Sequence, residues 1–128
     1  MELITFDSTS FRRSIVANKR PEVSFSKSDG RVFFNVRACE VMALAEGSRV
    51  VFVTDTEKKY WAVRVTDVET GFELAKRRPT DKGLCFISRG LVKEATGHFN
   101  NSKTFRVQIV SEPTDGMFEF IYHSINKF

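Results

Sequence analysis

The sequence predicts a mainly β fold with short helices, folded as one domain that contains an internal repeat. Several segments alternate apolar and polar side chains with a period of two, which is typical of half-buried strands. Thirteen Phe but only one Trp and two Tyr occur among the 128 residues, so most aromatic rings lack a polar group and are expected in a core. The order strand, strand, helix, strand, strand occurs twice, which indicates a repeat.

The first repeat spans residues 23–70. Asp29 and Gly30 form its first turn, because both tolerate the positive φ that tight turns require. Asn35 is expected to cap the helix that follows. The nearly continuous β run over 49–53 is expected to be buried on both sides. The expected elements are a strand over 23–27, a turn over 28–30, a strand over 31–34, a helix over 35–44, and strands over 49–53 and 60–65.

The second repeat spans residues 71–122 and follows the same plan. Ser88 is expected to cap its helix and Gly97 to end it. The expected elements are a strand over 72–76, a turn over 79–83, a strand over 84–87, a helix over 88–97, a strand over 105–110, a turn over 113–116 and a strand over 117–122.

Two fixed shifts align the repeats. A shift of 52 residues places Asp29 on Asp81, and we interpret both as turn-forming residues rather than as a catalytic pair of carboxylates. A five-residue insertion follows within residues 97–104. After it, a shift of 57 residues places Trp61 on Phe118.

Two segments lie outside the repeats. Residues 1–22 form an N-terminal extension, with an expected edge strand over 3–6 and a short helical turn over 11–17. Residues 123–128 form a C-terminal tail. The joint over 68–71 is too short to separate independent domains, so the two repeats are expected to share one core within a single domain, 1–128.

Cysteine and histidine usage predicts neither a metal site nor an enzyme. Cys39 and Cys85 stand 46 residues apart without a CxxC pattern, so we expect buried, reduced thiols in a cytoplasmic protein. His98 and His123 have no nucleophile or carboxylate in a recognisable arrangement. No apolar run approaches the ~18 residues of a membrane span, so we expect no membrane partner. We also expect no signal peptide, because the N-terminus has no basic region followed by an apolar stretch. No cofactor is expected.

The first repeat carries a recognisable motif. It runs from Phe25 to Asn35, through a turn that ends Gly30-Arg31-Val32, and continues from Leu44 to Phe52. This motif resembles the SpoVT/AbrB-like family, whose pattern is a strand, a turn ending Gly-Arg-Val, a second strand, a short helix, and Leu-x-x-Gly-Asp-x-Val leading into a third strand. Such proteins typically dimerise by interleaving swapped hairpins into one small barrel, and many are transcription regulators or antitoxins.

The resemblance implies a fold for the whole chain. Two units in one chain would correspond to such a dimer fused end to end, a pseudo-twofold β-barrel of two ββαββ units. A double-psi-type barrel is the alternative architecture. The chain departs from the family at Asn35, where Pro is common, and at Cys39-Glu40, where regulators commonly carry Arg. Lys82-Gly83 replaces the Gly-Arg of the first turn, so a DNA-binding site is expected to be asymmetric.

Positive charge concentrates ahead of each helix. Residues 11–37 carry seven positive and two negative side chains, a net of +5, and residues 71–93 carry six and two, a net of +4. A twofold arrangement would join these segments into one basic face that suits duplex phosphates. The alternative is that they are solvated strand faces and turn tips. The candidate DNA-binding residues are Lys27, Arg31, Arg37, Arg77, Arg78, Lys82 and Arg89.

The sequence therefore predicts a DNA-binding protein that acts as a transcription regulator, as a monomer or a homodimer. Duplex DNA is the expected partner, bound by the first strand–turn–strand of each repeat. The alternative is an antitoxin-like or accessory protein-interaction module that docks a protein partner through the C-terminal tail. Exposure of Tyr122, Ile125 and Phe128 would favour that alternative.

Overall fold

The computed structural model describes most of the chain. Residues 20–121 are described, apart from 56, 58–59 and 100–103. The expected strand over 3–6, the expected helical turn over 11–17 and the tail over 123–128 lie outside the described residues.

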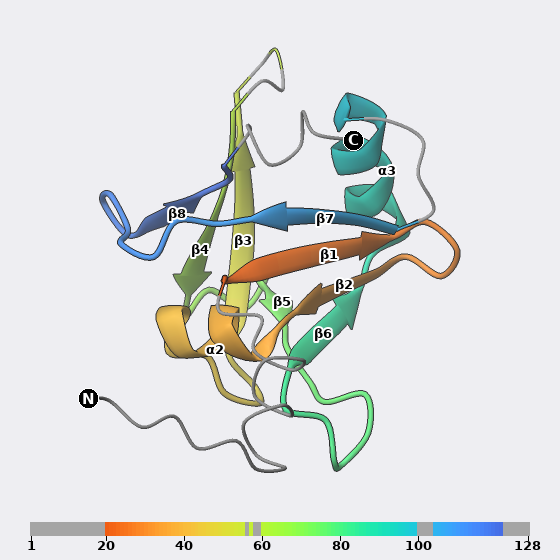
Figure 1. Cartoon of the computed structure of the whole chain (residues 1–128), viewed down its shortest axis with the longest axis vertical. Coiled ribbons are helices and arrows are strands. Elements are labelled where there is room, and N and C mark those ends of the chain that lie inside the picture. Colours follow the sequence, from red (N-terminus) through yellow and green to blue (C-terminus); the bar gives the residue numbers. More distant parts are fainter. Residues whose placement is uncertain (1–19, 56, 58–59, 100–103, 122–128) are drawn as a thin grey trace, which may run out of the picture.

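The expectation of a mainly β protein with short helices is confirmed. The elements in chain order are β1 (Glu22–Ser26), β2 (Arg31–Phe34), α2 (Val36–Met42), β3 (Arg49–Thr54), β4 (Trp61–Thr66), β5 (Phe72–Glu73), β6 (Leu84–Ile87), α3 (Arg89–Phe99), β7 (Thr104–Gln108) and β8 (Met117–Glu119). They form two four-stranded antiparallel sheets (Figure 1). The first sheet has the strand order β6-β2-β1-β7, and the second has the order β5-β3-β4-β8.

The two sheets do not close into the expected barrel. Between β5 of the second sheet and β6 of the first, a single bridge joins Ala75 to Cys85 in place of a continuous ladder. Beyond the ends of β7 and β8, a single bridge joins Ile109 to Phe120. The strand expected over 72–76 is reduced to the two residues of β5. Leu74, the next residue, is buried, but residues 75–80 are exposed and residues 76–78 are basic, so they offer few apolar side chains to bury by alternation.

The cap predicted for α2 is confirmed and has a second role. The Asn35 side chain accepts a hydrogen bond from the Ala38 N–H at 2.8 Å and another from the Glu22 N–H at 3.1 Å. One side chain thus starts the helix and holds the beginning of β1 beside it. The helix ends at Met42, earlier than expected, because Ala43 adopts a left-handed conformation with φ of 55°.

The cap predicted for α3 is also confirmed, but its end is not. Ser88 Oγ accepts from the Leu91 N–H at 3.2 Å. The helix runs through Gly97 to Phe99, since a glycine within a helix costs only about 1 kcal/mol. The two helices lie at opposite ends of the first sheet (Figure 1). In the described part of the chain, no helix is both long and apolar enough to span a membrane.

The prediction that β3 is buried on both sides is wrong. Val50 is fully buried, whereas Val51 and Val53 on the other face are partly exposed. The reason lies in the helices, which pack against β1 and β2 of the first sheet. Among the described residues, no helix therefore covers the outer face of the second sheet, as a doubly buried strand would require.

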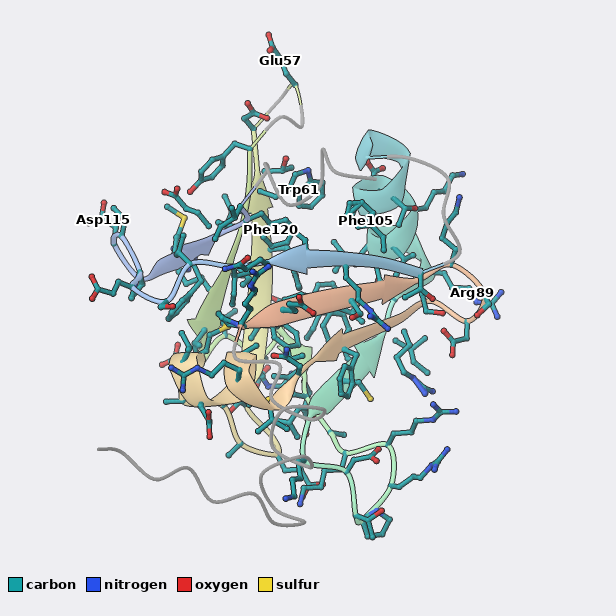
Figure 2. The ribbon with its side chains drawn as sticks, viewed as in Figure 1. Glu57, Trp61, Arg89, Phe105, Asp115 and Phe120 are labelled. Atoms are coloured by element: carbon teal, nitrogen blue, oxygen red, sulfur yellow. The ribbon has the colours of Figure 1, made fainter. Side chains whose placement is uncertain are left out.

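A cluster of aromatic rings joins the two sheets. Phe52 on β3 lies at its centre, although its own side chain is only partly buried. The centroids of five neighbouring rings lie 6.1–6.4 Å from that of Phe52, and these rings belong to Phe25, Phe34, Phe72, Phe86 and Phe120. Trp61 stacks on Phe120 at the side of this cluster (Figure 2). Such ring pairs add stabilisation beyond that of buried area alone.

We expect Phe52→Ala to lower the free energy of unfolding by about 3 kcal/mol, the lower end of the range for Phe→Ala, because the ring is partly exposed. The matched control is Val65→Ala on the neighbouring strand, where the side chain is 41% exposed. This control should cost no more than about 0.5 kcal/mol. Urea denaturation of both variants measures the difference, and equal losses would show that Phe52 is not central to the core.

Candidate functional site

The outer face of the first sheet is polar. Successive side chains of a strand point to opposite faces, so the burial of Val23, Phe25 and Val32 turns their neighbours outward. Across the sheet, Ser24 lies between Phe33 and Arg106. Among the residues that this register brings to the outer face, those that line a hollow are Ser24, Ser26, Arg31, Phe33, Thr104 and Arg106.

A hollow of about 550 Å³ lies over this outer face. Its floor comes from β1, β2 and β7, and its wall comes from the loop between β5 and β6, drawn in green in Figure 1. Five positive and two negative side chains line it, for a net charge of +3. The charged residues are Arg31, Arg77, Arg78, Lys82 and Arg106, with Asp29 and Asp81.

Arg31 is the least exposed of the five cations that line the hollow. It begins β2, and its Nε and Nη1 atoms are buried without a hydrogen-bond partner among the described residues. Arg77, Arg78, Lys82 and Arg106 are exposed instead. A buried donor that makes no hydrogen bond carries an energetic penalty, and the penalty is larger when the group is charged. Within the described part of the chain, the Nε and Nη1 donors of Arg31 are thus left unsatisfied.

The two carboxylates of the hollow are engaged in turns. Asp29 Oδ1 accepts from the Arg31 backbone N–H at 3.0 Å, and this hydrogen bond lowers the pKa of Asp29. Asp81 Oδ2 accepts from the Arg78 N–H at 3.0 Å. Both contacts agree with the interpretation of these residues as turn-forming. Among the described residues, neither carboxylate forms an ion pair with Arg31.

The hollow brings together some of the sequence-predicted residues and leaves others elsewhere. Arg31, Arg77, Arg78 and Lys82 line it, which unites the two basic segments. Three others lie outside its lining, namely Lys27, Arg37 and Arg89.

Each of these three residues has a different position. Lys27 is exposed in the turn between β1 and β2. Arg37 points to solvent on α2, where its Nη1 lies 3.2 Å from Glu40 Oε1. Arg89 lies beside the same β1–β2 turn (Figure 2), close to Gly30, where a Cβ would lie 2.5 Å from Arg89 Cγ. Lys27 and Arg89 thus continue the positive charge beyond one end of the hollow.

Arg106 was missed from the sequence, as were the polar residues around it. The alternation over 105–110 indicates that Arg106 points away from the core. That alternation does not reveal the strand beside β7. The antiparallel pairing of β1 with β7 places Arg106 opposite Ser24 and Thr104 opposite Ser26.

The β5–β6 loop that forms the wall of the hollow packs closely against β2 in its floor. A Cβ on Gly83 would overlap Phe33 Cζ and would lie 2.6 Å from the Phe34 carbonyl oxygen. A side chain is therefore excluded at Gly83 by close approach rather than by a left-handed backbone. Phe33 and Val36 give the hollow an apolar part beside its cations.

The expected burial of both thiols is confirmed. Cys39 and Cys85 are free and buried. Burial raises the pKa of the Cys85 thiol, against a smaller opposing effect of Arg31. A raised pKa reduces the thiolate fraction at neutral pH and so disfavours a nucleophilic role. In the described part of the chain, no group of three or more His, Cys, Asp or Glu side chains is placed to hold a metal ion.

Comparison with known proteins gives no further assignment. None of the family models, curated proteins or solved structures compared with the chain matches it. Function is therefore inferred from the geometry and the charge of the hollow.

We expect Gly83→Ala to lower the free energy of unfolding by about 1–3 kcal/mol, because the loop must move away from β2 to admit the methyl group. Gly90→Ala is the matched control, since nothing lies within 4 Å of a Cβ at that helical position. It should stabilise the protein by up to about 1 kcal/mol. Thermal and urea unfolding measure both changes. A neutral Gly83→Ala would mean that the loop does not rest on Phe33.

Proposed function

We propose that this protein binds duplex DNA through the outer face of its first sheet and the loop that borders it. The observation that carries the proposal is the gathering of five cations around one hollow. They come from three segments far apart in sequence, β2, the β5–β6 loop and β7, and they outnumber the carboxylates there by three. Folding thus concentrates positive charge that the total of +4 does not reveal.

Phosphate contacts explain why such a surface binds nucleic acid. Duplex DNA carries closely spaced negative charges and a layer of condensed counterions. Each Lys or Arg that neutralises a phosphate releases a counterion, which favours binding most at low salt. The exposed Arg77, Arg78 and Lys82 are placed on a loop that can follow the backbone, while Lys27 continues the charge along the β1–β2 turn. These contacts position the protein and do not read the base sequence.

The regulatory part of the proposal rests on the resemblance of the first repeat to SpoVT/AbrB-like proteins. It further proposes that the two repeats are related by a pseudo-twofold axis in a swapped-hairpin barrel. The strand register supports that relation, because Phe33 lies opposite Cys85, 52 residues later, and Ala62 lies opposite Glu119, 57 residues later. One facing pair in each of these antiparallel ladders thus has the separation of a shift that aligns the repeats, as is expected where a pseudo-twofold axis passes between the two strands.

The pairings between repeats also support this arrangement. The β1–β2 hairpin of the first repeat is flanked by β7 and β6 of the second. The single bridges Ala75–Cys85 and Ile109–Phe120 lie where a barrel would close. The protein-interaction alternative receives no such support. Phe118 is 7% exposed, and the tail residues that would dock a partner lie outside the described residues.

The proposal predicts strong salt dependence of DNA binding. If all five cations contact phosphates, the slope of log K against log salt for a random duplex should be about −4.5. Reversing two charges with Arg77→Glu plus Arg78→Glu should make this slope shallower by roughly 2 and should weaken binding by more than roughly tenfold at low salt. Fluorescence anisotropy at several salt concentrations measures both quantities.

The control double variant is Arg64→Glu plus Lys93→Glu. Both residues are exposed, and neither lines the hollow. The control removes the same total charge, so it separates local contacts from general attraction. Equal weakening by the two double variants would contradict the proposed face, and an absence of binding at low salt would exclude DNA as the partner.

A further inference from the structure

We propose that the hollow contains a discrete subsite for one phosphate group, with the Arg31 guanidinium as its centre. The inference deepens the proposed function and rests on it in one respect, namely that the same face receives the ligand. The subsite is a more specific claim than the basic face. A general basic face requires only exposed charge, whereas a subsite requires an enclosed cation with unused hydrogen-bond donors.

Arg31 meets this requirement. Its Nε and Nη1 atoms are buried and have no partner. Its neighbour across the β2–β6 ladder is Ile87, which has no polar side-chain atom, and Ser26 at the end of β1 also lines the hollow. Ser26 Oγ lies 3.0 Å from Ser28 Oγ, within hydrogen-bond distance. Among the described residues, Arg31 forms no ion pair, although its charge contributes to the lowered pKa of Asp29 in the same hollow.

A second arginine at the start of a strand supplies an internal comparison. Arg49 begins β3 as Arg31 begins β2, but Arg49 Nη1 donates to the carbonyl oxygens of Glu69 and Gly71 at 3.0 Å each. Its Nη2 lies 3.3 Å from Glu73 Oε1. The protein therefore supplies hydrogen-bond acceptors to Arg49, which begins a strand and has a structural role. Among the described residues, the Nε and Nη1 atoms of Arg31 have no such acceptors, which indicates that these donors serve a ligand.

The surroundings select a phosphate. Guanidinium groups form directional, charge-assisted hydrogen bonds with phosphate oxygens. Hydroxyl groups of Ser24, Ser26 and Thr104 share the hollow with Arg31 and offer further donors. Asp29 and Asp81 are held in turn hydrogen bonds, so they leave the net charge of +3 available to an anion. The exposed loop cations add attraction at the rim.

The first experiment measures stabilisation by inorganic phosphate. Phosphate replaces chloride at constant ionic strength while thermal unfolding is followed. A ligand that binds the native state raises Tm with its concentration. We expect a saturable rise for the wild type and for the control variant Arg64→Gln. We expect the rise to be lost in Arg31→Met, which corresponds to affinity lower by at least roughly tenfold.

The same variant contains an internal check on folding. Arg31→Met removes a buried, unpaired charge while keeping a long apolar side chain, so Tm of the free protein should stay the same or rise. Arg31→Lys keeps the charge without the planar fork and should retain only part of the phosphate effect. A marked fall in Tm of free Arg31→Met would overturn the proposal, because it would show that Arg31 is structurally paired.

A second pair of probes separates the two sources of phosphate. Amide chemical shifts of β2 are followed while inorganic phosphate or an unphosphorylated thymidine dinucleotide, which contains one phosphodiester, is added. Shifts with both probes assign the subsite to a nucleic-acid backbone. Shifts with inorganic phosphate alone assign it to a free phosphate group. If neither probe moves these resonances, the subsite does not exist.

The outcomes for the subsite and for DNA binding are separate. Phosphate stabilisation without duplex binding would refute the proposed function and leave the subsite. Duplex binding with unchanged salt dependence and affinity in Arg31→Met, together with no response to phosphate, would refute the subsite and leave the basic face.

Discussion

The packing of aromatic rings around Phe52 is the constraint on which the rest of the structure depends. Phe25, Phe34 and Phe86 reach this cluster from the first sheet, so the inner face of that sheet is fixed by the core. Because side chains alternate along a strand, fixing one face also fixes the other. Arg31 and Phe33 lie outside because Val32 and Phe34 lie inside. The position of the hollow follows from the core.

Pairing between the two halves of the chain supplies the remaining parts of the hollow. Its floor combines β1 and β2 from the first half with β7 from the second, and its wall is the loop ahead of β6. Neither half alone would hold Arg31 and Arg106 on one surface. The β2–β6 ladder and the close approach of Gly83 to Phe33 set where the loop cations stand. The candidate site is therefore a property of the assembled sheet, and local unfolding of one half would dismantle it.

The elements were predictable because their signals are local. Asn35 and Ser88 act as caps as expected, since a side chain that bonds a backbone N–H three residues later is visible in the sequence. The lengths of β5 and α3 were not predictable, because both depend on what the neighbouring strands offer. The same holds for Arg106. Alternation shows that it faces outward, but only the register of β1 against β7 places it beside Ser24 and the hollow. Separation into two sheets likewise depends on non-local pairing.

The arginines of this fold differ in their surroundings. Arg49 is held in structural contacts, whereas Arg31 and Arg106 line the hollow. Arg49 and Arg106 stand 57 residues apart, the shift that aligns the third strands of the repeats. Arg49 is held by two carbonyl oxygens and a carboxylate. Within the described residues, Arg106 has no such partner, and it faces a hollow in which Arg31 is also unpaired. Buried polar groups are nearly always satisfied in folded proteins, so the buried Nε and Nη1 atoms of Arg31, which have no partner among the described residues, call for a cause. The proposed binding of an anion would account for the contrast with Arg49, because the anion would supply acceptors to Arg31 like those that the protein supplies to Arg49.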